Sequence, residues 1–346
     1  MFQYISKIPF TNNSFKPSNF FYTIIFFWKE LRFPAFNFIR IFSTMYVDIS
    51  EWSMIVDKRN YTIKNIVRQD NESSLVELVN HARSQTFFCT VTKNQQIFEN
   101  MTKALNLVHH KNIIKMYESF TENGNYFIVH DTYSTKNLEQ ICPLPKEEVC
   151  MYSLQILSAI EALHNAGIYI SNLNPKNIYF DRFGLVKIVD FKDCFLMPKR
   201  FCSKFAVTTP RPAPELVEQT PYNPRSADLW NFGIVLFFLV NGRYPFHECK
   251  NIDTYKTEIQ DLLKLLDSNE EMLHRDAIKG LLQLDPFDRP KLEDVNRCFG
   301  LRKVQLPKGT LELNRSSSYL PLHCRSKSRP IHLMSYADVK SFYHSI

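Results

Sequence analysis

Side chains able to do chemistry gather in one part of the chain. They are three asparagines within six residues, a carboxylate further on and an ammonium two residues after it: Asn172, Asn174, Asn177, Asp190 and Lys192. A neutral amide cannot take up a proton at any working pH, so Asn172 offers no general base. Lys192 brings a cation close to the Asp190 carboxylate. The stretch therefore supplies polar ligands, while its first asparagine supplies no proton acceptor.

The composition indicates a globular chain longer than one average domain. It has 346 residues, of which 45% are apolar, so a domain of about 250 residues with extensions would fill it. The net charge of +7 is spread along the chain and predicts an ordinary solubilising surface, with no nucleic-acid partner expected. Eight cysteines without a C-x-x-C pair favour reduced thiols in a cytoplasmic protein over a disulfide frame or zinc site.

Residues 1–53 form an aromatic-rich extension of unknown role. Its apolar run, 20–28, is far shorter than the roughly 20 residues that a membrane helix needs. Lys7 and Lys16 precede this run, so a signal peptide or a membrane contact through residues 19–28 is an alternative. We favour an extension that packs on the domain, or sequence upstream of the true start.

The first half of the remaining chain has the pattern of a sheet with one helix. Polar residues between two β-rich runs predict a hairpin whose turn lies within 69–74. Helical spacing of apolar residues predicts a helix over 97–108. Strands are predicted over 61–67, 75–79, 86–93 and 126–129, with another between the helix and the last of these.

The second half is mostly helical. One helix is predicted over 146–165, and a second begins with Ser226 as its cap and stops at Asn241-Gly242. The second helix is apolar on nearly all sides, so we expect it to be the buried axis of this part. A membrane span is the rival interpretation, but Asp228, Asn231 and the short length contradict it. The tail, 300–346, is basic and contains serines, and we expect flexibility from residue 315.

Six short motifs occur in a fixed order between residues 110 and 290. They are His110-Lys111-Asn112, 170–177, Asp190-Phe191-Lys192, Ala213-Pro214-Glu215, 228–233 and 285–290. In this order they resemble the H-P-N, H-R-D-L-K-P-x-N, D-F-G, A-P-E, D-x-W-S-x-G and D-P-x-x-R-P motifs of the eukaryotic protein kinases. Thr208 matches the Thr that Ser/Thr kinases carry before A-P-E.

The resemblance implies an α+β bilobal fold over residues 54–299. A small lobe, about 54–129, would hold five strands and one main helix, and a larger, mostly α-helical lobe would span about 133–299. It also implies a buried ion pair between Glu215 and Arg289. A hydrophobic column through both lobes would contain Leu105, Met116, Ile170 and Phe191, anchored by Asp228.

The parts that handle phosphate in kinases are altered here. Asn172 stands at the position of the Asp that steers the substrate hydroxyl, and loss of a general base costs roughly 10²–10⁴-fold in rate. Asn174 replaces a Lys that neutralises the transferring phosphoryl group. The glycine-rich hairpin is absent, because no Gly precedes Gly124. Its turn instead carries Asp70 and Glu72.

The Lys of the third strand is also replaced. Alignment of 88–91 with the family pattern places Val91 at the Lys position. The family's helix Glu, which should pair with that Lys, lies nine residues before H-P-N, and counting back from His110 places Met101 there. Lys93, two residues on, would share a strand face with Val91, so it could substitute or could be a solvated surface Lys. Glu99 would lie on another side of the helix.

Some ligand positions remain. The resemblance assigns residual metal-ligand roles to Asp190 and Asn177, and one hypothesis is that the Lys192 ammonium replaces magnesium there; the other is that Lys192 turns to solvent. Tyr179 would lie beneath the adenine, filling the pocket or stacking on a base, and we favour filling. Further cofactor-binding positions are Cys89, Val129, His130 and Thr132.

These features predict a pseudokinase, a catalytically impaired kinase-like domain that acts in signalling as a protein scaffold or allosteric regulator. Its partners would be other proteins, such as an active kinase or a kinase substrate, and no cofactor is expected. The alternative is an atypical, active Ser/Thr kinase that uses Lys93, Asp190 and Asn177 with ATP and magnesium. A membrane-recruited adaptor is compatible with the first interpretation.

Overall fold

The computed structural model describes residues 49–82, 84–196 and 209–300. The described residues divide into a small unit, 49–63 and 80–82, and a large unit, 64–79, 84–196 and 209–300. In the small unit, residues 49–57 form a helix, and the backbone N–H of His81 donates to the Asn60 carbonyl at 3.0 Å. The apolar run 20–28, Thr208 and the tail from 301 lie outside the described residues.

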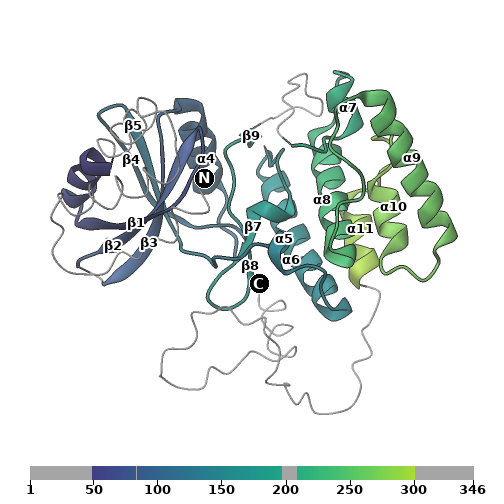
Figure 1. Ribbon diagram of the computed structural model, residues 1–346, viewed down its shortest axis with the longest axis horizontal. Helices are drawn as coiled ribbons and strands as arrows, with labels where there is room; N and C mark the ends of the chain where they lie inside the picture. The colour runs from purple at the N-terminus through teal and green to yellow at the C-terminus, as the bar shows by residue number, and fades with distance from the viewer. Residues whose placement is uncertain (1–48, 83, 197–208, 301–346) are drawn as a thin grey trace, which may run out of the picture. The chain divides into compact units, whose positions relative to one another are not determined.

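Five strands form one sheet in the order β1-β2-β3-β5-β4 (Figure 1). Their bounds are β1 Tyr61–Gln69, β2 Ser73–Asn80, β3 Gln85–Thr92, β4 Met116–Glu122 and β5 Asn125–His130. β5 pairs antiparallel with both β3 and β4. The tight β4–β5 turn is made by Asn123 and Gly124, both with positive φ, which these residue types tolerate. The predicted strands are therefore present, with small shifts at their ends.

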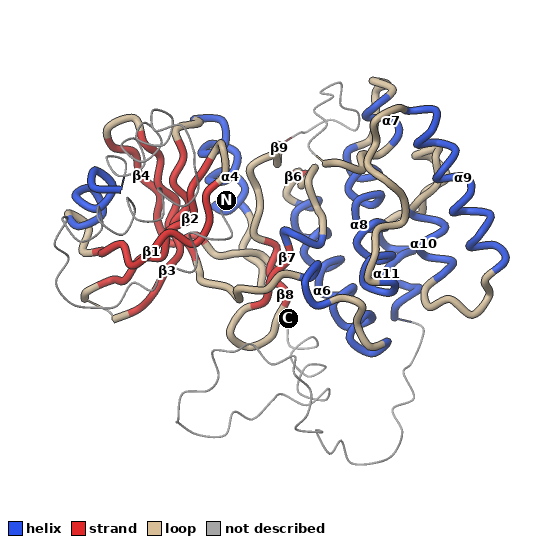
Figure 2. The backbone as a smooth tube through the Cα atoms, in the orientation of Figure 1, coloured by secondary structure: helices blue, strands red, loops and turns tan. Residues whose placement is uncertain are grey.

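Helix α4, Gln95–Leu107, covers one face of this sheet (Figure 2). Asn94 caps its first turn by accepting hydrogen bonds from the backbone N–H groups of Gln96 and Ile97. The face that includes Ile97 and Met101 is buried and shares a core with Ile128 of β5. This helix therefore defines an inner face of the sheet, on which Ile128 lies.

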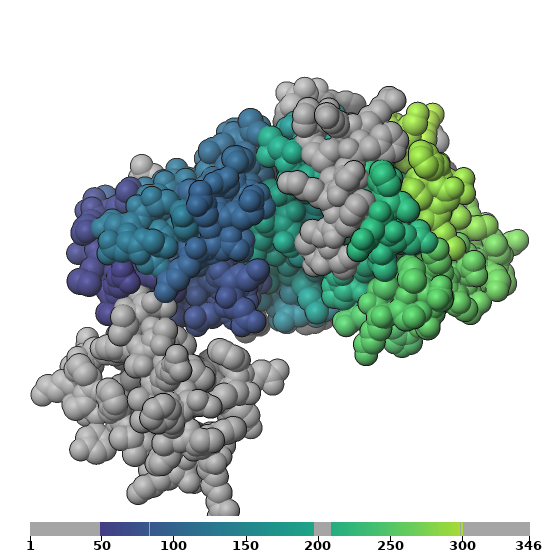
Figure 3. Space-filling view, turned by 90° about the horizontal axis from the view of Figure 1, so that it is seen from above, coloured from purple at the N-terminus to yellow at the C-terminus, as the bar shows by residue number. Residues whose placement is uncertain are grey.

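The later part of the chain is mainly helical. Its helices are α5 Leu138–Ile141, α6 Lys146–Asn165, α7 Pro214–Val217, α8 Pro224–Asn241, α9 Ile252–Ser268, α10 Arg275–Leu281 and α11 Leu292–Gly300. Two small sheets precede α7, formed by β6 Ile168–Tyr169 with β9 Phe195–Leu196, and by β7 Ile178–Phe180 with β8 Val186–Ile188. Figure 3 shows the strand-rich part in purple to blue and the later helices in green to yellow. The expected α+β bilobal fold is confirmed.

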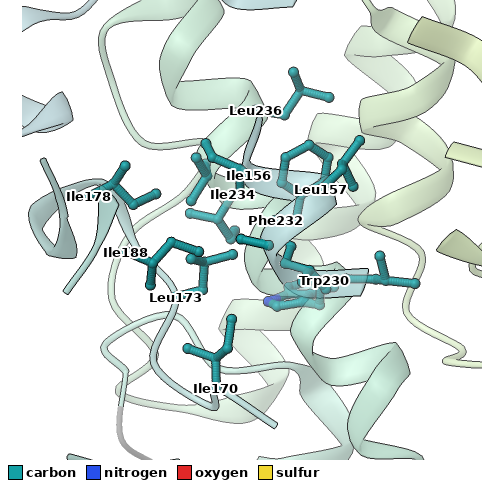
Figure 4. Close-up of a cluster of buried hydrophobic side chains, with 14 of the residues drawn as sticks. Ile156, Leu157, Ile170, Leu173, Ile178, Ile188, Trp230, Phe232, Ile234 and Leu236 are labelled. Carbon is teal, nitrogen blue, oxygen red and sulfur yellow. The ribbon is translucent and has the colours of Figure 1, made fainter. Parts of the chain in front are cut away.

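Helix α8 is the buried axis of the helical part, as its apolar sequence predicts. Side chains of α6, β7 and β8, such as Ile156, Ile178 and Ile188, lie in one buried cluster with those of α8 (Figure 4). The predicted cap was wrong. Asn223 caps the helix by accepting from the N–H of Arg225, and Ser226 lies inside it and donates to the Pro286 carbonyl at 2.8 Å. Gly242, with φ of 67°, ends the helix as expected.

Among the described residues, no helix is long and apolar enough to cross a membrane.

The helical core encloses a charged pair. The two terminal nitrogens of the Arg289 guanidinium, Nη1 and Nη2, each lie 2.7 Å from a carboxylate oxygen of Glu215, and both side chains are almost completely buried. Arg289 also donates to the carbonyls of Gln283 and Ser226. Removing one partner of such a pair costs about 3–5 kcal/mol, because the other charge is left buried.

Close packing of α8 on the next helices requires glycine at position 233. A Cβ there would lie 2.8 Å from the Cβ of Leu281 and 2.9 Å from Cδ2 of Leu282. We expect Gly233→Ala to lower the free energy of unfolding by about 1–3 kcal/mol, since the neighbouring backbone must shift. Gly280→Ala is the control, because its Cβ would meet only an ordinary 3.4 Å contact with Pro290. Urea denaturation of both variants tests this, and equal losses of stability would contradict it.

Candidate functional site

The loop that follows β6 is fixed by one buried carboxylate. Asp228 of α8 accepts from Nε2 of His164 at 2.8 Å and from the backbone N–H groups of Ile170 and Ser171 at 3.1 and 3.0 Å. Ser171 adopts a left-handed conformation with φ of 62°. Because these donors come from α6 and from the loop, Asp228 fixes where the chain continues into Asn172.

The Asn172 carboxamide is hydrogen-bonded at both ends. Its nitrogen donates to Oδ2 of Asp193 at 3.1 Å, and its oxygen accepts from Nδ2 of Asn174 at 2.8 Å. Asn177 donates to the Asn172 backbone carbonyl at 3.2 Å. The three asparagines therefore form one local network.

Asp193 belongs to this site, although sequence reasoning missed it. Burial raises its pKa, and the nearby Asp190 carboxylate raises it further, while the hydrogen bond from Asn172 acts in the opposite direction. Its position three residues after Asp190 was the available signal. A carboxylate therefore does lie beside Asn172, but it is bound to the amide that replaces the base.

Lys192 does not pair with Asp190, contrary to the hypothesis that its ammonium replaces magnesium there. Its Nζ lies 2.7 Å from Oδ2 of Asp70, and the Lys192 side chain is only 13% exposed, so it does not turn to solvent either. Asp190 instead accepts the backbone N–H of Lys192 at 3.1 Å. The partner of the ammonium comes from the β1–β2 turn.

The β1–β2 turn closes around its own carboxylate. Oδ1 of Asp70 accepts from the backbone N–H groups of Glu72 and Ser73 at 2.9 and 2.8 Å. Burial alone would raise the pKa of Asp70, but hydrogen bonds from Lys192 and from these N–H groups outweigh it and hold the pKa below its usual value. The donors that a glycine-rich turn would offer to phosphate are therefore bound to a protein anion.

The structure corrects the assignment of Val91 to the strand-three Lys position. Thr92 pairs with Tyr126 in the β3–β5 register, and Phe98 of α4 packs on the Tyr126 ring, so Thr92 lies on the inner face. Val91 is one residue earlier and therefore faces the opposite side. The hydroxyl of Thr92 donates to the Glu72 carbonyl at 2.7 Å. The inner face thus carries a neutral hydroxyl there.

The two proposed substitutes for the Lys–Glu pair lie elsewhere. Lys93 follows the end of β3 in a bend and is exposed. Glu99 pairs with Lys103 at 3.0 Å on the surface of α4. Met101 is buried in the core at 2% exposure. Lys93 therefore does not reach inward from the same strand face as Val91. The strand ends before Lys93, and the register of β3 turns Val91 away from the inner face.

The predicted base-binding positions divide between the two faces of the sheet. Cys89 pairs with Val129, and both lie on the far face with Val91, while His130 lies on the inner face. Thr132 is exposed in the connection after β5. Only His130 of these strand residues therefore faces the same side as α4.

Aromatic side chains cluster around His130. Tyr133 stacks parallel to the His130 ring, with centroids 6.3 Å apart, and meets the rings of Phe88 at 5.0 Å and Tyr179 at 4.6 Å. Burial strongly raises the pKa of Tyr133, so its hydroxyl is neutral. Sequence reasoning identified His130 and Tyr179 but missed Phe88 and Tyr133 as members. The four rings form a packed cluster from β3, β5, the β5–α5 connection and β7.

The hydrophobic column has its expected members in one core. Leu105, Ile170 and Phe191 are buried at 2% exposure or less, and Met116 packs partly buried against the same cluster. Ile170 is also the residue whose N–H binds Asp228. This apolar core therefore joins α4 and β4 to the loop after β6.

The match with known proteins agrees with this architecture. The family model of the protein kinase domain matches residues 63–298. The chain belongs to the protein kinase family. The matched range includes the sheet except for the first two residues of β1, and the helices from α4 to α10 with most of α11. The same range contains all six ordered motifs.

Several serine/threonine kinases are similar to this kinase domain. The probable serine/threonine-protein kinase KCC4 of Saccharomyces cerevisiae is 29% identical over 233 residues, 62% of this chain and 22% of that protein. The testis-specific serine/threonine-protein kinase 5 of Mus musculus is 32% identical over 204 residues, 54% of this chain and 53% of that protein. The chain thus spans about a fifth of the yeast relative and about half of the mouse relative.

The hydrogen bonds of His130 suggest a test of the aromatic cluster. Nδ1 lies 3.1 Å from the Asp131 carbonyl, which can only accept, so Nδ1 carries the proton and Nε2 accepts from the Thr90 hydroxyl at 3.0 Å. Burial lowers the pKa of His130 from 6.5 to about 4. The unfolded chain therefore takes up this proton first as the pH falls.

We expect His130 to stabilise the fold fully above pH 6.5 and to lose roughly 3 kcal/mol of that contribution as the pH falls to about 4. The slope of the unfolding free energy against pH reports how many more protons the unfolded chain binds than the folded one. In His130→Gln this difference should be smaller by about one proton in this interval. Urea titrations at several pH values measure the slope, with the same replacement at exposed His247 as control. An unchanged slope in His130→Gln would show that the folded protein already binds this proton.

Proposed function

We propose that this kinase domain is a pseudokinase that acts in signalling through contacts with other proteins rather than by phosphotransfer. The observation that carries the proposal is the Asp70 carboxylate within the β1–β2 turn, bound to the turn's N–H groups and to Lys192. A nucleotide phosphate at this turn would have to displace the Asp70 carboxylate from the turn's N–H groups and from the Lys192 ammonium. The donors that could hold a phosphate are already bound to a protein anion, so the turn disfavours a triphosphate.

The residues that face the same region support the proposal. Thr92 and Met101 place no charge where the family has its Lys–Glu pair, and Asn172 offers an amide in place of a base. Asn174 supplies no cation to the transferring group. These residues act together in catalysis, so the rate losses from each change cannot be multiplied. Restoring one of them would still leave the other catalytic residues missing.

The fit to magnesium and ATP is poor. Asp190 and Asn177 could each offer an oxygen to a cation. No cluster of three or more His, Cys, Asp or Glu side chains suited to a metal occurs in the described ranges. The Tyr133 ring packs against both Phe88 and Tyr179, which supports filling by Tyr179 over stacking on a base.

The second candidate is an atypical Ser/Thr kinase. The observations in its favour are the retained Asp190 and Asn177 and the kinase names of the relatives. It would use ATP and magnesium, with Asp193 as a nearby carboxylate. The exposed Lys93 weakens it, because no described cation on the inner face of β3 takes the place of the family's Lys.

For partners we propose other proteins, such as an active kinase or one of its substrates, in the cytoplasm. The domain would span residues 54–299. The surfaces offered are the helical lobe, the extensions and the segment 190–215, of which residues 197–208 lie outside the described part. Recruitment to a membrane through residues 19–28 is compatible with this role and predicts loss of vesicle cosedimentation when residues 1–53 are deleted.

The proposal predicts no saturable rise in melting temperature when ATP and magnesium are added to the full chain. It also predicts phosphotransfer to a generic protein substrate no higher than that of Asp190→Ala. Asn172→Asp should remain at the same background, since the turn and β3 are unchanged in it. A saturable shift, or transfer by the natural sequence above the Asp190→Ala control, would favour the active kinase instead.

A further inference from the structure

All three polar groups of Lys192 are engaged, each by a different partner. The ammonium binds Asp70 of the β1–β2 turn at 2.7 Å. The backbone N–H donates to Asp190 at 3.1 Å, and the backbone carbonyl accepts from Nδ2 of Asn100 in α4 at 2.8 Å. One residue thus joins three elements that are far apart in the sequence.

Neighbouring contacts reinforce the same junction. The thiol of Cys194, two residues on, donates to the Asn100 backbone carbonyl at 3.4 Å. The Asn100 side chain is itself oriented by Gln96, whose amide donates to Oδ1 of Asn100 at 2.7 Å. The Asn100 amide thus has both a fixed acceptor and a fixed donor. The contact between α4 and the turn after β8 therefore has two hydrogen bonds in opposite directions: Asn100 donates to Lys192, and Cys194 donates to Asn100.

We propose that Lys192 is a ligand-independent lock that holds the β1–β2 turn, α4 and the turn after β8 together. This proposal rests on the proposed function, because a domain that binds no nucleotide needs contacts of its own to hold these three elements together. The Lys192 side chain is 13% exposed and that of Asp70 is 41% exposed. The pair is thus sheltered at the lysine and accessible at the carboxylate.

Two replacements separate the ion pair from the turn itself. Asp70→Asn keeps a side-chain oxygen that can accept from Glu72 and Ser73, so it removes the charge while leaving the turn's own hydrogen bonds. Lys192→Met removes the ammonium and leaves both backbone bonds of residue 192. Lys103→Met is the matched control, because Lys103 pairs with Glu99 within α4 alone.

The test is amide hydrogen exchange of the full chain without nucleotide. We expect Asp70→Asn and Lys192→Met each to speed exchange about fivefold at 68–75 and 190–196, as for loss of an interaction worth about 1 kcal/mol. The double variant should exchange no faster than either single one, because both remove the same pair. Lys192→Arg should retain the protection of the natural sequence. Lys103→Met should leave both segments unchanged.

The remaining outcomes each decide one proposal. Unchanged exchange in both single variants, or additive effects in the double variant, would overturn the lock. Either result would leave the proposed function standing if the natural chain still fails to bind ATP. Conversely, saturable ATP binding by the natural chain would overturn the proposed function, while coupled exchange effects would still establish the lock.

Discussion

A carboxylate buried in an apolar core must find hydrogen-bond donors, and Asp228 meets this requirement in a way that fixes the site. At 1% exposure it accepts from His164 and from the N–H groups of Ile170 and Ser171. Helix α8 supplies the acceptor, and α6 and the loop after β6 supply the donors. The position of Asn172 follows, because it is the next residue along this loop.

The charged contacts of the protein are of two kinds, buried in the helical core or partly exposed at the site. Asp228 and the Glu215–Arg289 pair lie inside the helical core, where any unpaired charge would be strongly unfavourable. Asp70 and Lys192 lie at the partly exposed site, where such a pair is worth less. Glu215 and Arg289 in the core and Asp190 and Asn177 at the site keep the residue types of the kinase motifs, whereas Asn172 and Asn174 do not. A fold can keep its interior and change the chemistry of its site, because the two are stabilised by different residues.

Neutral and aromatic groups complete the altered site. Thr92 binds the Glu72 carbonyl of the β1–β2 turn, and Asn172 binds Asp193, so polar groups satisfy one another. The rings of Tyr133 and Tyr179 pack beside His130. Each of these contacts is internal to the protein. Together they explain how the region can be held in place by its own side chains.

Local patterns in the sequence determined the fold. Continuous apolar character identified α8 as a buried axis, helical spacing placed α6 at Lys146–Asn165, and the ordered motifs indicated the kinase architecture. Such signals depend on neighbours along the chain or on short fixed spacings, so they survive without an alignment. The asparagine network was also foreseeable in part, because its members lie within six residues of each other.

Tertiary structure alone decided the partners. Lys192 binds Asp70 across 122 positions of sequence, a pairing that no local pattern contains. The face of β3 depends on register, and a shift of one residue exchanges Thr92 for Val91 at the inner side. Tyr133 joined the aromatic cluster because the chain after β5 turns it onto His130. Sequence thus specified which elements form, whereas the packing of distant elements specified which side chains meet.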